Sequence, residues 1–205
     1  METPMLAKSR SYLLWVLSLG VALVSWRFLV LGVETSMPFM THHLEPRALA
    51  LYAHIGLAPV ALALLPFQFS PRLRAARPGL HRWIGRAYAV TILVSGLAGL
   101  SLALNTAAGP VAAWGFGLLA VLWIAVTAQA VRLAMLGRIA AHRAWMIRSA
   151  ALTLAAVTLR LELPILALTL GFETGYPLVA WLCWVPNALV AEWIVRPRGA
   201  GVRVA

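Results

Sequence analysis

Two histidines stand at matching places in the sequence, each followed by arginine and tryptophan and then by a long apolar run. The first opens the stretch HRWIGR at His81, and the second opens HRAWMIR at His142. Two imidazoles that face each other on neighbouring helices provide the axial ligands of a b-type haem, because the iron takes one nitrogen from each side. Arginines close by would pair with the haem propionates. We therefore predict a haem b site with these two histidines as iron ligands and four arginines at the propionates: Arg82, Arg86, Arg143 and Arg148.

A simpler interpretation of the same residues stays open. Arginine and tryptophan are typical of helix ends at the membrane surface, where they contact lipid headgroups, and a histidine can do the same. Glu192 falls at a similar depth, and we expect it to form a structural ion pair with an arginine of this layer. The chain has one cysteine and no His-x-x-x-His pair, so it offers no competing metal motif of comparable strength.

A second group of ionisable residues lies inside the apolar runs, where such residues are costly and are candidates for function. The group consists of Arg27, His54, Arg160 and Glu162. Arg160 is expected about 18 Å beyond Arg148 along its helix, in the outer half of the membrane. Residues 160 and 162 cannot share one helix face, because two positions represent about 200° of rotation. Arg160 therefore needs a partner on another helix, or a ligand.

The charge balance of this outer group favours a ligand with an anionic or carbonyl-bearing head. A quinone fits, because His54 and Arg160 can hydrogen-bond its carbonyls and Glu162 can accept a proton. The alternative is that the arginines extend toward the membrane surface, which is easy for Arg27 and harder for Arg160. Pro164 follows soon after and is expected to kink this helix.

The stretch between the first two apolar runs contains Met-x-x-Met-x-His-His, formed by Met37, Met40, His42 and His43. Thioethers and imidazoles are soft ligands that suit copper. A loop with two histidines is more often only a loop, and both interpretations stay open.

The composition places the chain in the membrane. The 205 residues are 62% hydrophobic and only 11% charged, and a soluble domain of this length needs a more polar surface. Apolar runs of about 20 residues, the length that crosses a bilayer, recur along the chain. We predict an all-α bundle of six transmembrane helices that forms one domain over residues 1–205, with spans at about Tyr12–Leu31, Ala48–Phe69, Trp83–Leu104, Val111–Val131, Trp145–Leu170 and Pro177–Val195.

The basic residues predict the orientation of this bundle. The net charge of +11 would also suit a nucleic-acid partner, but all but three of the 17 Lys and Arg residues cluster at alternate helix ends. The exceptions are Arg27, Arg47 and Arg160. By the positive-inside rule, both chain termini face the cytoplasm. The expected partner is the lipid bilayer, and the expected location is a bacterial cytoplasmic membrane.

The two histidine stretches also suggest an internal repeat. Each leads into a helical hairpin whose second helix begins near a glycine and a proline, at Gly109-Pro110 and at Gly175-Tyr176-Pro177. Two hairpins of the same orientation can pack around an axis along the membrane normal, which would bring His81 and His142 to corresponding positions. The alternative is that membrane helices share such end residues without being related.

The chain resembles an uncharacterised family of bacterial membrane proteins, domain of unknown function 2306. The matching stretches are Pro66-Phe67-Gln68-Phe69, HRWIGRAY from His81, HRAWMIRS from His142, AAVTLR ending at Arg160, and WLCWVPN from Trp181, followed by Glu192. The chain departs from the family pattern at three positions. The family has glycine at the position of Leu65, an aromatic residue at that of Ala150, and often an aromatic residue at that of Glu162. A mechanism that needs Glu162 would therefore not be general. The resemblance implies a multi-helix membrane protein and carries no established activity.

Two classes of function follow from these residues. One is an electron-transfer module with haem b and quinone. The other is a non-catalytic membrane module that binds or transports a small or lipid-like ligand, or supports a partner complex. Hydrolase and nucleotide-binding motifs are absent from the sequence.

Overall fold

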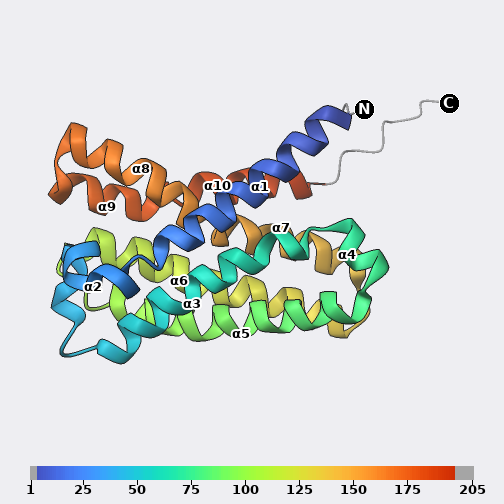
Figure 1. Ribbon diagram of the computed structural model, residues 1–205, viewed down its shortest axis with the longest axis horizontal. Helices are drawn as coiled ribbons and strands as arrows, with labels where there is room; N and C mark the ends of the chain where they lie inside the picture. The colour runs from blue at the N-terminus through green and yellow to red at the C-terminus, as the bar shows by residue number, and fades with distance from the viewer. Residues whose placement is uncertain (1–3, 197–205) are drawn as a thin grey trace.

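The computed structural model describes residues 4–196, and every regular element within this range is a helix (Figure 1). The elements are α1 (Pro4–Ser25), α2 (Phe28–Ser36), η1 (Pro38–His43, a 3-10 helix), α3 (Ala48–Gln68), α4 (Pro71–Ala76), α5 (Pro78–Ala103), α6 (Gly109–Met135), α7 (Ile139–Thr153), α8 (Ala155–Leu170), α9 (Phe172–Leu182) and α10 (Val185–Val195). The all-α fold predicted from the sequence is confirmed.

Five helical stretches of the described residues are long and apolar enough to cross a membrane. Three are single helices, α3, α5 and α6, and two are formed by consecutive helices, α7 with α8 and α9 with α10. The pair α1 and α2 makes a sixth candidate, but its two helices are bent by 73° against each other. The described residues thus form a multi-pass helical protein with five candidate spans, or up to six if the bent pair is counted as one span.

The first span is not the continuous helix that was expected over Tyr12–Leu31. The helix α1 ends at Ser25, and the chain bends before α2 begins at Phe28. Arg27 lies at the bend and donates hydrogen bonds to Val24 O at 3.3 Å and to Ser36 O at 2.7 Å. These carbonyl groups lie on either side of the bend, so the guanidinium group of Arg27 stabilises it.

The fifth span is interrupted at Leu154, well before Pro164, where a kink was expected. The helix α8 continues through Pro164, while Leu154 separates it from α7. Asn187 of α10 spans this junction, because its side-chain amide donates to Ala151 O at 3.3 Å and to Thr158 Oγ1 at 2.9 Å. A side chain from a distant helix therefore supports the interruption, and the local sequence does not reveal it.

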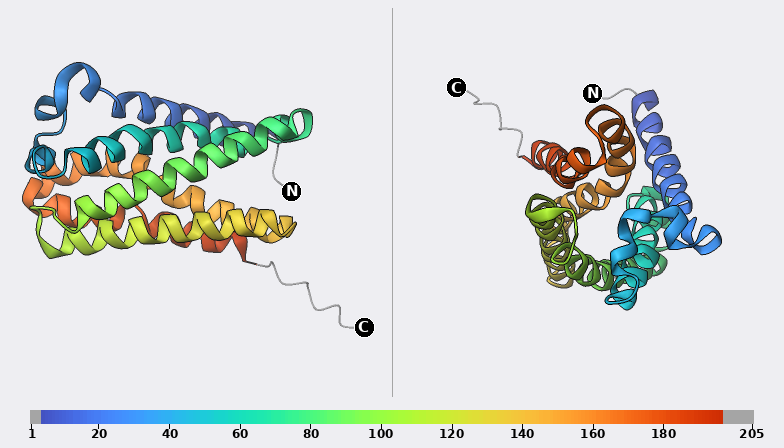
Figure 2. Two further views of the ribbon diagram at one scale, coloured as in Figure 1. Left: turned by 90° about the horizontal axis from the view of Figure 1, so that it is seen from below. Right: turned by 90° about the vertical axis from the view of Figure 1, so that its left-hand side faces the viewer.

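The spanning helices form a ring when the bundle is viewed along its long axis (Figure 2, right). The helix α3 packs against α5, α5 against α6, and α6 against α7. The described chain begins and ends at the end of the bundle that holds α4, called here the α4 end, and the opposite end holds η1 and is called the η1 end (Figure 1). The two termini themselves, which are predicted to be cytoplasmic, lie outside the described residues.

Candidate functional site

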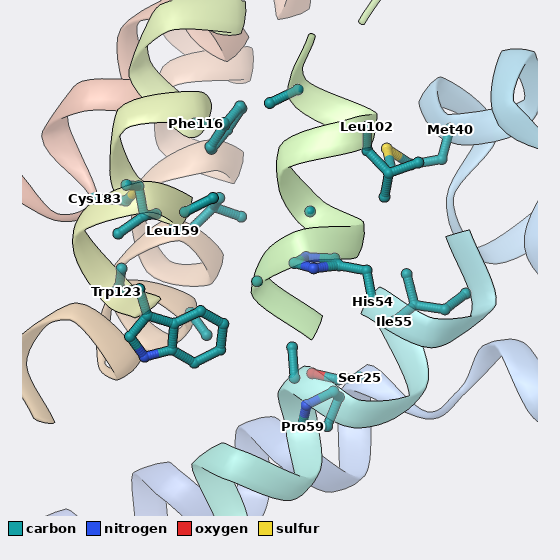
Figure 3. Close-up of a pocket in the computed structure, with 18 of the residues that line it drawn as sticks. Ser25, Met40, His54, Ile55, Pro59, Leu102, Phe116, Trp123, Leu159 and Cys183 are labelled. Carbon is teal, nitrogen blue, oxygen red and sulfur yellow. The ribbon is translucent and has the colours of Figure 1, made fainter. Parts of the chain in front are cut away.

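A cavity of about 240 Å³ lies among the spanning helices in the half of the bundle toward η1 (Figure 3). Leucine, alanine, proline and aromatic side chains form most of its wall, with contributions from α3, α5, α6 and α8. Phe39 and Tyr176 line it near η1, and Trp123 and Thr153 line it deeper in the bundle. Two of the ionisable residues predicted from the sequence, His54 and Arg160, also line it. The structure therefore brings these two residues to one apolar cavity.

His54 extends from α3 toward α5 (Figure 3), where its Nδ1 lies 2.8 Å from Ser95 O. The ring occupies space that a side chain at residue 99 would need, since a Cβ added to Gly99 would lie 2.7 Å from Nδ1. With Nδ1–H donating to the backbone carbonyl, Nε2 is the nitrogen that can accept a hydrogen bond. The backbone of α5 thus fixes both the position of the ring and the nitrogen that a ligand would meet.

Arg160 has no acidic partner within residues 4–196. Its one described hydrogen bond runs from Nη1 to Ala156 O at 2.9 Å, one turn earlier on the same helix. The charge of Arg27, which has the same sign, acts on it. Glu162 does not line the cavity, and its Oε2 is buried without a hydrogen bond among the described residues. Arg160 is thus a cation that lines an apolar cavity without a carboxylate partner among the described residues.

Three further residues line the cavity at its η1 end: Met37, Met40 and His43. The His43 side chain is only 1% exposed, and its Nδ1 is buried without a hydrogen bond in the described part of the chain. Burial, the neighbouring His42 and Arg47 lower the pKa of His43 to about 4, so its imidazole is neutral at physiological pH. His42 is oriented differently, because its Nε2 accepts a hydrogen bond from Ala107 N at 3.2 Å.

The histidines predicted to bind haem, His81 and His142, lie in the first turns of α5 and α7 and do not line this cavity. The Nδ1 of His142 donates to Ala130 O at 2.8 Å, and the Nδ1 of His81 is buried without a hydrogen bond among the described residues. The two rings are close enough to interact electrostatically.

The arginines around these histidines are engaged to different degrees. Arg148 forms the ion pair with Glu192 that was expected, through Nε at 2.6 Å and Nη2 at 2.9 Å, and its guanidinium lies 5.0 Å from the Trp145 ring. Arg86 lies 5.6 Å from the ring of Trp83. The side chains of Arg82 and Arg143 are exposed. Arg148 is therefore the least free of the four to pair with a propionate.

A buried network of hydrogen-bonded side chains joins α5, α6 and α7. On α5 it lies between His81 and Gly99, the residue that contacts His54. Tyr88 Oη lies 3.0 Å from Ser149 Oγ and 2.7 Å from Thr153 Oγ1. Trp123 Nε1 donates to Thr153 Oγ1 at 2.9 Å. Sequence analysis missed this network, although the HRWIGRAY and HRAWMIRS stretches end in its tyrosine and serine.

Residues 51–195 match a family model described as a predicted membrane protein, DUF2306. The chain belongs to this family. No curated protein and no solved structure matches it. The match to DUF2306 confirms the resemblance stated from the sequence motifs. It includes His54, Arg160, His81 and His142, and it begins after η1, so the methionines and His43 at the η1 end of the cavity lie outside it.

Proposed function

We propose that this DUF2306 protein is a membrane module that binds a lipophilic ligand with a carbonyl or carboxylate head. The observation that carries the proposal is the position of Arg160, a cation beside an apolar cavity with no carboxylate partner among the described residues. A charged group in such a place is costly when it is unpaired. A ligand head that accepts hydrogen bonds from the guanidinium would supply the missing partner.

His54 provides the second polar contact for this head. Its ring is held by the hydrogen bond to Ser95 O and fits in the space that Gly99 leaves because it has no side chain. The position of the ring is therefore set before any ligand arrives. The neutral ring, in the tautomer with the proton on Nδ1, offers Nε2 as an acceptor. In this tautomer Nε2 accepts a hydrogen bond and cannot donate one to a quinone carbonyl. The second contact is therefore made by a quinol hydroxyl or a protonated carboxylic acid, whereas a quinone carbonyl or a carboxylate would contact Arg160 alone.

The rest of the cavity wall is apolar and suits the apolar body of a ligand. The cavity volume of about 240 Å³ lies below the roughly 300 Å³ at the lower end of typical ligand sites. The cavity therefore accommodates one ring or a short alkyl segment, and a longer tail would extend out of it. Quinones and amphipathic acids share this combination of one polar head and an apolar tail, and they are the ligand classes we propose.

The proposal is tested by thermal unfolding of the purified, delipidated protein in detergent, with decyl-ubiquinol and decanoic acid as the probes. Binding should raise the unfolding temperature, by an amount that corresponds to about 2.7 kcal/mol when the probe is present at 100 times its dissociation constant. Arg160→Leu should abolish this rise. Without probe, Arg160→Leu should be as stable as the unmutated protein or more stable, because the variant removes a partly buried charge.

The matched control is Arg132→Leu. Arg132 is exposed at the end of α6, and in the described chain its side chain makes one hydrogen bond, from Nη1 to Gln129 Oε1 at 3.4 Å. This variant should keep the response to both probes. A probe response that persists in Arg160→Leu would place the ligand elsewhere. Strong destabilisation of the probe-free Arg160→Leu protein would mean that an internal partner holds this side chain, and either result rejects the proposed site.

A haem b site at His81 and His142 is a second candidate function. It is favoured by the hydrogen bond from His142 Nδ1 to Ala130 O, because haem- and metal-ligating histidines usually donate their other ring N–H to a carbonyl or carboxylate. The two histidines are also close enough for the charge of one to act on the other. Such a haem would supply one-electron chemistry. Arg82, Arg86 and Arg143 remain for its propionates, since Arg148 pairs with Glu192.

The visible spectrum of the protein, purified from haem-replete cells and reduced with dithionite, tests this candidate. Haem b would give its characteristic reduced bands, and His81→Ala or His142→Ala would each remove or shift them. His42→Ala, which changes a histidine at the η1 end, is the control and should leave the bands unchanged. A folded but colourless protein rejects this candidate and leaves the arginines as anchors to lipid headgroups.

A further inference from the structure

Three potential metal ligands lie in or directly before the short helix η1. A 3-10 helix has three residues per turn, so side chains three positions apart lie above one another, and Met40 and His43 have this spacing within η1. Met37 is the residue before the helix, with a non-helical backbone (φ −146°, ψ 61°), and its carbonyl accepts a hydrogen bond of 2.9 Å from Met40 N. All three residues line the η1 end of the cavity. Figure 3 shows Met40 extending from η1 toward Leu102 of α5.

The burial of His43 is the second observation. Its side chain is 1% exposed, and its Nδ1 has no hydrogen-bond partner among residues 4–196. A buried polar atom without a partner is unfavourable, so its presence calls for an explanation. The adjacent His42 differs, because its Nε2 accepts a hydrogen bond from Ala107 N.

We infer that Met37, Met40 and His43 bind one Cu(I) ion at the η1 end of the cavity. Two thioethers and one imidazole form a soft, neutral donor set, which selects Cu(I) over harder cations such as Zn(II), Mg(II) and Ca(II). A neutral donor set also suits a monovalent ion. A divalent ion bound by neutral ligands would keep two positive charges in a poorly solvated place, whereas Cu(I) keeps only one. The site involves no carboxylate and no cysteine, and no group of three His, Cys, Asp or Glu side chains suited to a metal occurs in the described part of the chain.

The surroundings of the three residues support a site that is set before the metal arrives. Met37 and Met40 pack against the buried cluster formed by Phe28, Val33, Leu51, Ile55 and Leu102, which restrains their positions. The ring of His42 packs on that of His43, with the two centroids 3.9 Å apart. The site does not use Arg160 or His54, so it is independent of the proposed ligand head.

The experiment is an anaerobic titration of the full-length protein in detergent with Cu(I), in competition with the chromogenic chelator bicinchoninate. We expect one Cu(I) per chain. Met37→Leu, Met40→Leu and His43→Gln should each weaken binding by about tenfold or more, as loss of even a supporting group does at metal sites. Leucine replaces methionine with little change in volume, so the two methionine variants should fold even if His43→Gln does not.

The control matches the methionine ligands in residue type. Met135→Leu changes an exposed methionine at the end of α6 and should leave Cu(I) affinity unchanged. X-ray absorption at the copper edge should show sulfur and nitrogen ligands in the unmutated protein. Absence of Cu(I) binding, equal losses in Met135→Leu and Met40→Leu, or a copper spectrum without sulfur would each overturn the inference.

Discussion

Tyr88 of α5 and Ser149 of α7 share a hydrogen bond of 3.0 Å between two buried hydroxyl groups, 61 residues apart in the sequence. The same sequence offset separates His81 from His142. His81 lies seven residues before Tyr88 on α5, and His142 lies seven residues before Ser149 on α7. Seven residues are close to two full helical turns. The hydrogen bond therefore sets a register between α5 and α7 that also places the two histidines at the same level.

Tyr88→Phe should lower the stability of the protein while leaving the probe response of the cavity intact. The phenol is 1% exposed and bonds both Ser149 and Thr153, so its removal deletes two buried hydrogen bonds. We expect a loss of about 0.5–1.5 kcal/mol, because each hydroxyl keeps another partner. Thermal unfolding in detergent measures it. Tyr12→Phe, at a side chain that is 71% exposed, is the control, and equal losses in the two variants would show that the network contributes nothing.

Gly99→Ala should impair ligand binding without changing any residue that contacts the head group. The new Cβ would lie 2.7 Å from His54 Nδ1, which is too short, so the imidazole must move and its bond to Ser95 O should break. The thermal response to decyl-ubiquinol should fall relative to the unmutated protein. Gly56→Ala on α3 is the control, because nothing lies within 4 Å of its added Cβ. An undiminished response in Gly99→Ala would mean that His54 does not orient the ligand.

Glu192→Gln should have only a small effect on stability. The carboxylate accepts two hydrogen bonds from Arg148, but the two side chains are 49% and 24% exposed, so solvent and headgroups screen the pair. We expect a loss below about 1 kcal/mol in detergent. A double-mutant cycle with Arg148→Gln measures the coupling directly. A coupling of several kcal/mol would indicate a much drier environment than these exposures imply.

The orientation in the membrane is open to direct measurement with topology reporters. Fusions within Arg72–Arg77 and at the end of the chain should report the cytoplasm, and fusions near Glu45 or Glu173 should report the opposite side. The reason is the clustering of the basic residues at alternate helix ends, together with the placement of the first and last described helices at the α4 end. A reporter near Arg72–Arg77 on the outer side of the membrane would contradict this orientation.

Much of the architecture follows from local properties of the sequence. In a bilayer each crossing segment must satisfy its backbone hydrogen bonds within itself, so an apolar run of sufficient length becomes a helix regardless of its neighbours. The helices α3, α5 and α6 accordingly lie close to the predicted spans Ala48–Phe69, Trp83–Leu104 and Val111–Val131. The separation of residues 160 and 162 on their helix is local in the same sense, and Arg160 lines the cavity while Glu162 does not.

Other features depend on contacts between segments that are distant in the chain. The bend after α1 is supported by contacts from Arg27 to Ser36 O and from Trp26 Nε1 to Gly56 O, and the break at Leu154 is spanned by Asn187. The hydropathy of these segments is continuous, so it could not indicate either interruption. The match of Gly99 to the His54 ring also requires that α3 and α5 be packed together.

The sequence by itself therefore determined the helical, membrane-spanning class and the residue types available for chemistry, because both depend on local hydropathy and identity. The tertiary structure decided which of those residues meet. It assembled His54, Arg160 and the η1 methionines around one cavity, left His81 and His142 outside it, and engaged Arg148 with Glu192. The physical reason is that helix packing sets the rotation and depth of every side chain relative to other helices, and no single apolar run contains that information.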